Sequence, residues 1–195
     1  MARPKEFDEE EAIAAAGEQF RRKGYEATST DDLLKVMGIG RGSLYASFGA
    51  KQALFDRALK QYRDEIFACG IEILENSDNG SDGLRAFFAN KAGEADMPVA
   101  KHGCLIVNST VELGPMNDSV ANELTNSWKR LEEAFFGAIQ RAQMNGHIDR
   151  AKSPRSLALF CVTLLRGLSV GAKLDFDSAK AEKVTDLAMR TLFEE

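Results

Sequence analysis

The sequence predicts an all-α protein. Apolar residues recur at steps of three and four along most of the chain, which is the period of a helix with one buried face. Alternating apolar and polar runs long enough to predict a strand are missing from the sequence. Glycine, proline and asparagine separate the periodic segments. This pattern predicts about nine helices, arranged as an N-terminal three-helix domain with helix-turn-helix spacing and a larger C-terminal helical bundle.

Composition narrows the class of protein. The 195 residues suffice for a sizeable core, and 44% hydrophobic with 28% charged residues is typical of a globular chain. The net charge of −5 argues against non-specific coating of nucleic acid, so any DNA-binding face depends on how charges are sorted on the surface. With no apolar run of membrane-spanning length and no secretory leader after Met1, we expect a cytoplasmic protein with no membrane partner.

Cysteine and histidine usage predicts neither a cofactor nor a metal site. Cys69, Cys104 and Cys161 are widely spaced, and only two histidines could join them as ligands. The sequence also contains no nucleophile-elbow, phosphate-loop or HExxH pattern. An enzyme is therefore not expected.

The first two helices have clear start and stop signals. Asp8 can cap a helix over 9–23, and Gly24 can end it. The buried stripe of this helix is formed by Ala12, Ile13, Ala16 and Phe20. A second, short helix follows Ser29 as its N-cap and ends before Gly38.

A third helix over 41–48 is the candidate DNA-reading element. Leu44 and Phe48 share one face and are expected to pack inward. The outward residues are then small or polar, namely Gly42, Ser43, Ala46 and Ser47. Such a surface can enter the major groove, where bulk would block approach to the bases. Arg41 can reach a guanine edge or a phosphate, Tyr45 can donate to a phosphate, and Lys51 opens the next helix beside the same backbone.

Six further helices are predicted beyond residue 50, with a polar loop at 75–82. They cover 51 to about 74, a segment around 84–88, 103–113, 118–144, 154 to about 173, and 178–193. Ser153 and Pro154 form a strong start signal for the penultimate one. We assign residues 1–51 to a DNA-binding domain and 52–195 to an effector-binding and dimerisation domain.

The stretch from Phe20 to Leu54 resembles the DNA-binding domain of the TetR/AcrR family of transcriptional regulators. The matching positions are Phe20, Gly24-Tyr25, Thr28-Ser29, Leu33-Leu34, Gly38-Ile39, Leu44-Tyr45, Phe48 and Lys51. The resemblance implies that Thr28 and Ser29 contact phosphates, that Lys51 holds the backbone, and that the remaining DNA contacts come from Arg41, Gly42, Ser43 and Tyr45. Gly40 and Ala50 depart from the family pattern, which usually has a hydroxyl residue at each of these positions.

The later segments HGCLIVNSTVELGP and LLRGLSVGAKLDFD are also similar to stretches of this family. The resemblance implies that the last two helices pair with a second subunit, so that a homodimer reads a palindromic double-stranded operator. The helix over 154–173 independently has more apolar surface than one partner helix needs. The interface candidates are Leu157, Phe160, Leu164, Leu168, Val184 and Leu187.

Core packing is the default role of the aromatic residues in the bundle, but some could line an effector cavity. The candidates for this cavity are Phe87, Phe88, Cys104, Asn108, Glu112, Trp128, Phe135 and Arg166. The predicted function is a repressor that an unidentified small molecule releases from its operator. Two alternatives stay open: a regulator that senses oxidants or electrophiles through Cys104, and a helical interaction module or enzyme without DNA function.

Overall fold

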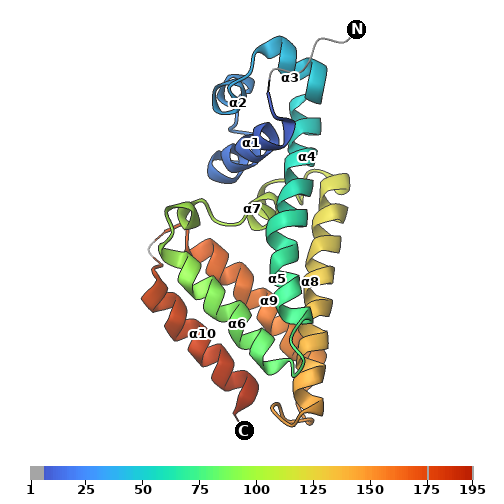
Figure 1. The fold of residues 1–195 in the computed structure, drawn as a ribbon, viewed down its shortest axis with the longest axis vertical. Coiled ribbons are helices and arrows are strands. Elements are labelled where there is room, and N and C mark those ends of the chain that lie inside the picture. Colours follow the sequence, from blue (N-terminus) through green and yellow to red (C-terminus); the bar gives the residue numbers. More distant parts are fainter. Residues whose placement is uncertain (1–6, 175, 195) are drawn as a thin grey trace.

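The computed structural model describes residues 7–174 and 176–194, and over these residues it contains helices and no strand (Figure 1). The α-helices are α1 Glu9–Lys23, α2 Thr30–Met37, α3 Arg41–Phe48, α4 Lys51–Tyr62, α5 Ala68–Glu75, α6 Ser81–Gly93, α7 Leu105–Glu112, α8 Asp118–Met144, α9 Pro154–Gly171 and α10 Ser178–Phe193. A π-helical turn, η1 Arg63–Phe67, joins α4 to α5 without a break. Counted as one rod, α4–η1–α5 makes nine helices in the described chain, so the predicted all-α fold is confirmed.

The N-terminal helices begin and end at the predicted residues. The Asp8 carboxylate accepts hydrogen bonds from the backbone N–H groups of Glu10 and Glu11, and Gly24 ends α1 with a φ of 88°. Ser29 caps α2 in a reciprocal capping box with Asp32. These signals act between residues that are close in sequence, which is why the sequence alone predicted them.

The rod α4–η1–α5 connects the two parts of the molecule (Figure 1). Leu54 and Phe55 at its start are buried against α1, and Phe20 packs edge-on against Phe55 with ring centroids 5.2 Å apart. The prediction of one regular helix over 51–74 was wrong at η1. A π-helical turn adds one residue to a turn while the chain stays helical, so the apolar period barely changes and does not reveal it.

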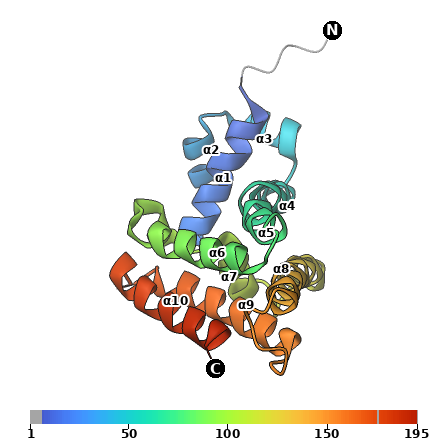
Figure 2. The ribbon, with the colours of Figure 1, turned by 60° about the horizontal axis from the view of Figure 1, so that its bottom comes forward.

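The C-terminal bundle is built on α5, α6, α8, α9 and α10. α8 packs along α9, and α6 packs against both α5 and α10 (Figures 1 and 2). Phe87 and Phe88 of α6 meet Phe135 of α8 with ring centroids 4.9 and 5.7 Å apart. These fully buried rings form the centre of the bundle.

Two short 3-10 helices between α6 and α7 were not predicted. η2 covers Glu94–Asp96 and η3 covers Pro98–His102. α7 then starts at Leu105 rather than at 103, because Gly103 has a φ of 72° that an α-helix does not allow. Within the described residues, no helix has the length and apolarity needed to cross a membrane.

Candidate nucleic-acid interface and ligand cavity

α3 turns a bare surface to solvent. Leu44 and Phe48 are buried as predicted, whereas Gly42, Ser43 and Tyr45 are exposed, with 52% of Tyr45 accessible. Apart from its chain neighbours and the backbone of α3, no described residue lies within 4 Å of where a Cβ on Gly42 would stand. The face that the sequence predicted to meet DNA is therefore open.

Arg41 stands at the first turn of α3 beside an acidic neighbour. Its guanidinium donates to the Asp31 carboxylate at 2.5 Å, and both side chains are mostly exposed. An ion pair this exposed is weak, on the order of 0.2–1 kcal/mol. A DNA phosphate can therefore replace Asp31 as the partner of Arg41 at small cost.

Lys51 is held at the start of α4. Its ammonium donates to the backbone carbonyl of Thr28 at 3.0 Å and lies 4.3 Å from the centre of the Tyr25 ring. The N-cap position before it, Ala50, has the extended backbone of a cap but makes no side-chain cap hydrogen bond. The start of α4 therefore combines the charge of Lys51 with backbone amides that no side-chain cap occupies.

Thr28 and Ser29 differ in their exposure and in their hydrogen bonds. Thr28 is completely buried and its hydroxyl donates to the carbonyl of Gly24, so in this conformation its side chain is closed to a phosphate. Ser29 remains exposed, although its hydroxyl is engaged with Asp32. Hydrogen bonds from Lys23 and Ser29 hold the pKa of the Asp32 carboxyl well below its usual range.

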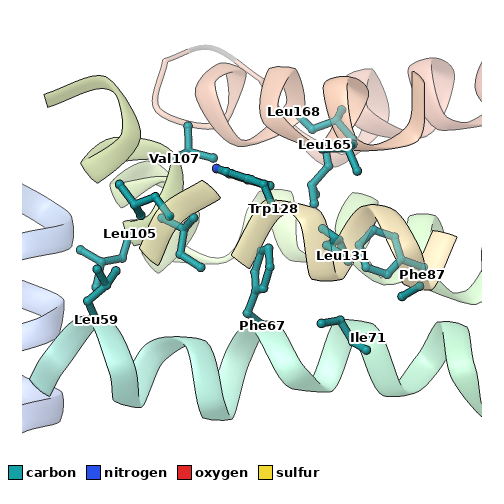
Figure 3. Packing of buried hydrophobic residues seen from close by; sticks show 14 of the residues in the cluster. Leu59, Phe67, Ile71, Phe87, Leu105, Val107, Trp128, Leu131, Leu165 and Leu168 are labelled. Carbon is teal, nitrogen blue, oxygen red and sulfur yellow. The ribbon is translucent and has the colours of Figure 1, made fainter. Parts of the chain in front are cut away.

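A cavity of about 320 Å³ lies in the bundle beside η1. Its aromatic wall includes Phe67 of η1 and Trp128 of α8, which meet edge to face at 5.5 Å (Figure 3). Leu131, Leu165 and Phe87 line it on the bundle side (Figure 3). A π-helical turn is common at functional sites, and here Tyr62, Ile66, Phe67 and Gly70 of the rod all border the cavity.

Three of the predicted cavity residues, Phe87, Cys104 and Trp128, line this space. The other five candidates do not line this cavity. Phe88 and Phe135 are sealed in the core, and the Arg166 guanidinium lies 4.4 Å from the centre of the Trp128 ring without lining the cavity. Glu112 accepts from the backbone of Tyr25 in the DNA-binding domain, and Asn108 donates to the carbonyl of Arg21 in the same domain.

Sequence reasoning missed several polar residues of the cavity wall, Arg21 and Tyr62 among them. Arg21 is on α1, where its charge suits the end of the helix and gives no sign of a second role. Tyr62 is on α4 and lines the cavity together with Cys104. Burial and the neighbouring Cys104 thiol raise the pKa of Tyr62 well above its ordinary value, so the phenol stays protonated at neutral pH. Only the long-range packing brings these residues together.

The predicted dimer face on α9 and α10 is apolar and partly open. Phe160, Leu164, Leu168 and Val184 line a shallow groove of about 380 Å³, and Leu187 is 59% exposed. Leu157, the sixth candidate, is half-buried against the core. An apolar helix surface of this kind is typical of a subunit interface.

Family models match both parts of the chain. Residues 12–58 match the model described as bacterial regulatory proteins, tetR family, and residues 80–188 match the model described as tetracyclin repressor-like, C-terminal domain. The chain is 32% identical over 193 residues to the uncharacterized HTH-type transcriptional regulator YezE of Bacillus subtilis, covering 98% of this chain and 100% of that protein. It is 45% identical over 171 residues to the HTH-type transcriptional repressor BdcR of Escherichia coli, covering 88% and 82% of the two chains.

The structure is also similar to a solved protein–DNA complex. The TetR family regulator CifR, a cysteine mutant complexed with 26-base-pair operator DNA, superposes with a TM-score of 0.86 at 28% identity. The match covers 96% of this chain and 98% of CifR. Together with the two family models and the exposed face of α3, these matches show that the chain belongs to the TetR family of bacterial transcriptional regulators.

Proposed function

We propose that this regulator acts as a repressor: a homodimer binds a palindromic operator through α3 and leaves it when a small molecule enters the cavity beside η1. The observation that carries the DNA half is the face of α3, where Leu44 and Phe48 anchor the helix inward and leave Gly42 and Tyr45 uncovered. The relatives BdcR and ComR of Escherichia coli are named repressors, which supports repression over activation.

The proposed DNA contacts are made by two kinds of residue. Gly42 and Ser43 let α3 approach the bases, while Arg41 exchanges Asp31 for a phosphate or a guanine edge. The phosphate contacts are completed by Ser29, Tyr45, Lys51 and the backbone around Thr28. Because Thr28 is buried, its own part is to hold the loop that carries Ser29 and to orient Lys51 through its carbonyl.

We propose an uncharged and largely apolar effector. Each charged side chain on the cavity wall already has an opposite partner, because Arg21 pairs with Glu18 at 3.3 Å and Lys91 with Glu94 at 2.7 Å. A charged ligand would lose its hydration without gaining a free counter-charge. The aromatic wall and the protonated Tyr62 hydroxyl suit a ring-containing molecule with one polar group.

The second copy would cover the apolar face of α9 and α10. The exposed side chains there, Leu159, Phe160 and Leu187, extend the groove between the two helices. In this proposal residues 1–51 bind DNA, residues 52–195 bind effector and partner, and α4 packs on both parts; residues 1–6 lie outside the described residues. The protein would act in the cytoplasm, where the operator is.

The decisive experiment is selection of bound sequences from random double-stranded DNA by the native protein. We expect an inverted repeat, with half-sites about one helical turn apart or somewhat more if the dimer is wide. Affinity for the selected site should fall in Arg41→Ala and Tyr45→Phe, while Lys129→Ala, which removes an exposed cation of α8, serves as the control. Selection of no sequence, or equal binding by all variants, would contradict the proposal.

A second candidate function has one observation in its favour, which is that Cys104 lines the cavity. An electrophile entering the cavity could form a C–S bond with this thiol, whose proton would pass to solvent. N-ethylmaleimide should then release DNA from the wild type and from Cys69→Ser but not from Cys104→Ser. Cys161 is a poor rival, because burial raises its pKa to about 12. Release that persists in Cys104→Ser would exclude this candidate.

A further inference from the structure

The segment that precedes α7 and α7 itself touch both the cavity and the DNA-binding domain. Val99, Ala100, Gly103 and Cys104 line the cavity. Within ten residues of Cys104 the chain packs against α1 and α4. This short stretch is therefore a physical connection between the proposed effector site and the helices that position α3.

Glu112, at the end of α7, holds the loop between α1 and α2. Its carboxylate accepts hydrogen bonds from the backbone N–H groups of Tyr25 at 2.9 Å and Glu26 at 2.8 Å. These two consecutive N–H groups therefore point the same way, directly after Gly24 with its φ of 88°. A Cβ on Gly24 would stand 2.9 Å from a carboxylate oxygen of Glu112, so glycine also makes room for the contact.

Asn108, one turn earlier on the same face of α7, holds the end of α1. Its amide nitrogen donates to the carbonyl of Arg21 and to the carbonyl of His102, both at 2.9 Å. The Arg21 guanidinium in turn donates to the carbonyls of Gly103 and, at 2.8 Å, Val99. The end of α1 and the cavity-lining segment are thus bonded to each other directly and through Asn108.

The loop that Glu112 holds leads on to the DNA-facing groups. The Tyr25 ring packs against Phe55 with ring centroids 4.9 Å apart, and the Lys51 ammonium lies 4.3 Å from the centre of the Tyr25 ring. Lys51 also donates to the carbonyl of Thr28 in the same loop. A displacement of the backbone at Tyr25 therefore changes the surroundings of Lys51 and the entry into α2.

We propose that Glu112 and Asn108 are positioning residues that transmit occupation of the cavity to the DNA-binding domain. An effector that displaces the cavity-lining segment 97–104 moves α7, and α7 pulls on the loop at Tyr25 and Glu26 and on the end of α1. The inference rests on the proposed function in one respect, which is that the effector occupies the cavity beside η1. Because Glu112 itself lies outside the cavity wall, it acts on DNA binding without touching the effector.

The first measurement is amide-resolved hydrogen exchange on the full-length protein without DNA. Charge-assisted hydrogen bonds protect the amides of Tyr25 and Glu26, so Glu112→Gln should speed their exchange by about tenfold or more. Glu72→Gln, which alters an exposed carboxylate of α5, is the matched control and should leave both amides unchanged. The contact of the Glu112 carboxylate with the amides of Tyr25 and Glu26 is called the clamp below. Unchanged exchange in Glu112→Gln would overturn it.

The second measurement fills the cavity. The probe is N-phenyl-1-naphthylamine, an uncharged aromatic molecule whose binding is followed by its fluorescence. Ala172→Phe, which places a ring inside the cavity wall, provides an occupant that does not depend on the probe. Occupation by either route should speed amide exchange at Tyr25 and Glu26 at least threefold when Glu112 is present. In Glu112→Gln it should not increase the exchange rate further.

The third measurement is operator affinity with and without the probe, on the selected DNA. The probe should weaken binding by the same factor in the wild type and in Glu72→Gln, and by a factor at least threefold smaller in Glu112→Gln. An equal factor in Glu112→Gln, or an occupied cavity that leaves Tyr25 and Glu26 unchanged, would overturn transmission through the clamp. If occupation of the cavity speeds exchange of these amides while operator affinity stays constant, the proposed release of DNA by an effector is refuted. The link from the cavity to the two amides through Glu112 is then retained.

Discussion

Removing the acidic partner of Arg41 should strengthen DNA binding. In the free protein the Arg41 guanidinium donates to the Asp31 carboxylate at 2.5 Å, and this pair must open before Arg41 reaches a phosphate. Asp31→Asn removes the competing anion and a negative charge near the DNA backbone. An exposed ion pair contributes about 0.2–1 kcal/mol, which corresponds to roughly 1.5- to 5-fold in affinity per subunit. Two subunits on one operator then give about 2- to 25-fold.

The assay is fluorescence anisotropy of labelled operator at several salt concentrations. Asp31→Asn should bind more tightly at each concentration, and its affinity should fall more steeply with salt because Arg41 is freer to displace counterions. Asp78→Asn, which changes an exposed carboxylate in the loop before α6, is the charge-matched control and should resemble the wild type. Equal affinities for Asp31→Asn and Asp78→Asn would refute the proposed contact between Arg41 and DNA.

Four further predictions concern stability and assembly. Gly24→Ala should lose about 1–3 kcal/mol in urea unfolding, because φ is 88° and the new methyl group would press on Glu112; unchanged stability would contradict the geometry. Because the pKa of Asp32 is lowered in the folded protein, its carboxylate stabilises the fold fully above its ordinary pKa near 4 and loses this effect as the pH falls. The difference in unfolding free energy between wild type and Asp32→Asn should therefore be large at pH 7 and smaller at pH 3. Ala50→Ser should raise unfolding stability by about 0.5–2 kcal/mol by capping α4, and a loss would show that the cap site is closed. Leu187→Glu should convert the dimer to monomer in sedimentation, and an unchanged mass would place the interface elsewhere.

Much of the DNA-binding half could be predicted from local patterns. The cap at Ser29, the stop at Gly38 and the inward face of Leu44 and Phe48 all depend on neighbours within about one helical turn. Such signals can be recognised from the sequence alone. The phosphate contact of Thr28 was implied by the family resemblance. The burial of Thr28, with its hydroxyl bonded to the carbonyl of Gly24, could not be predicted from local spacing.

Membership of the cavity was a harder question, because most aromatic residues of a bundle have the same helical spacing whether they pack or line a space. Phe87 and Phe88 are adjacent on α6 and both buried, yet only Phe87 borders the cavity. Which of the two faces the open volume depends on the rotation of α6 against α5 and α8. The sequence determines that both are apolar and leaves the choice between them to packing.

The sequence by itself determined the all-α class, the caps of α1, α2 and α9, the exposed face of α3 and the family of the chain, because each rests on residues a few positions apart. Only the tertiary structure decided that Arg21 and Tyr62 border the cavity and that Glu112 holds the amides of Tyr25 and Glu26. The physical reason is separation along the chain: the Glu112 contact joins residues 87 positions apart and the Arg21 contact with Gly103 joins residues 82 apart. Such pairs have no period or spacing in the sequence, and they form only when the packing of α1 against α7 brings them within hydrogen-bond distance.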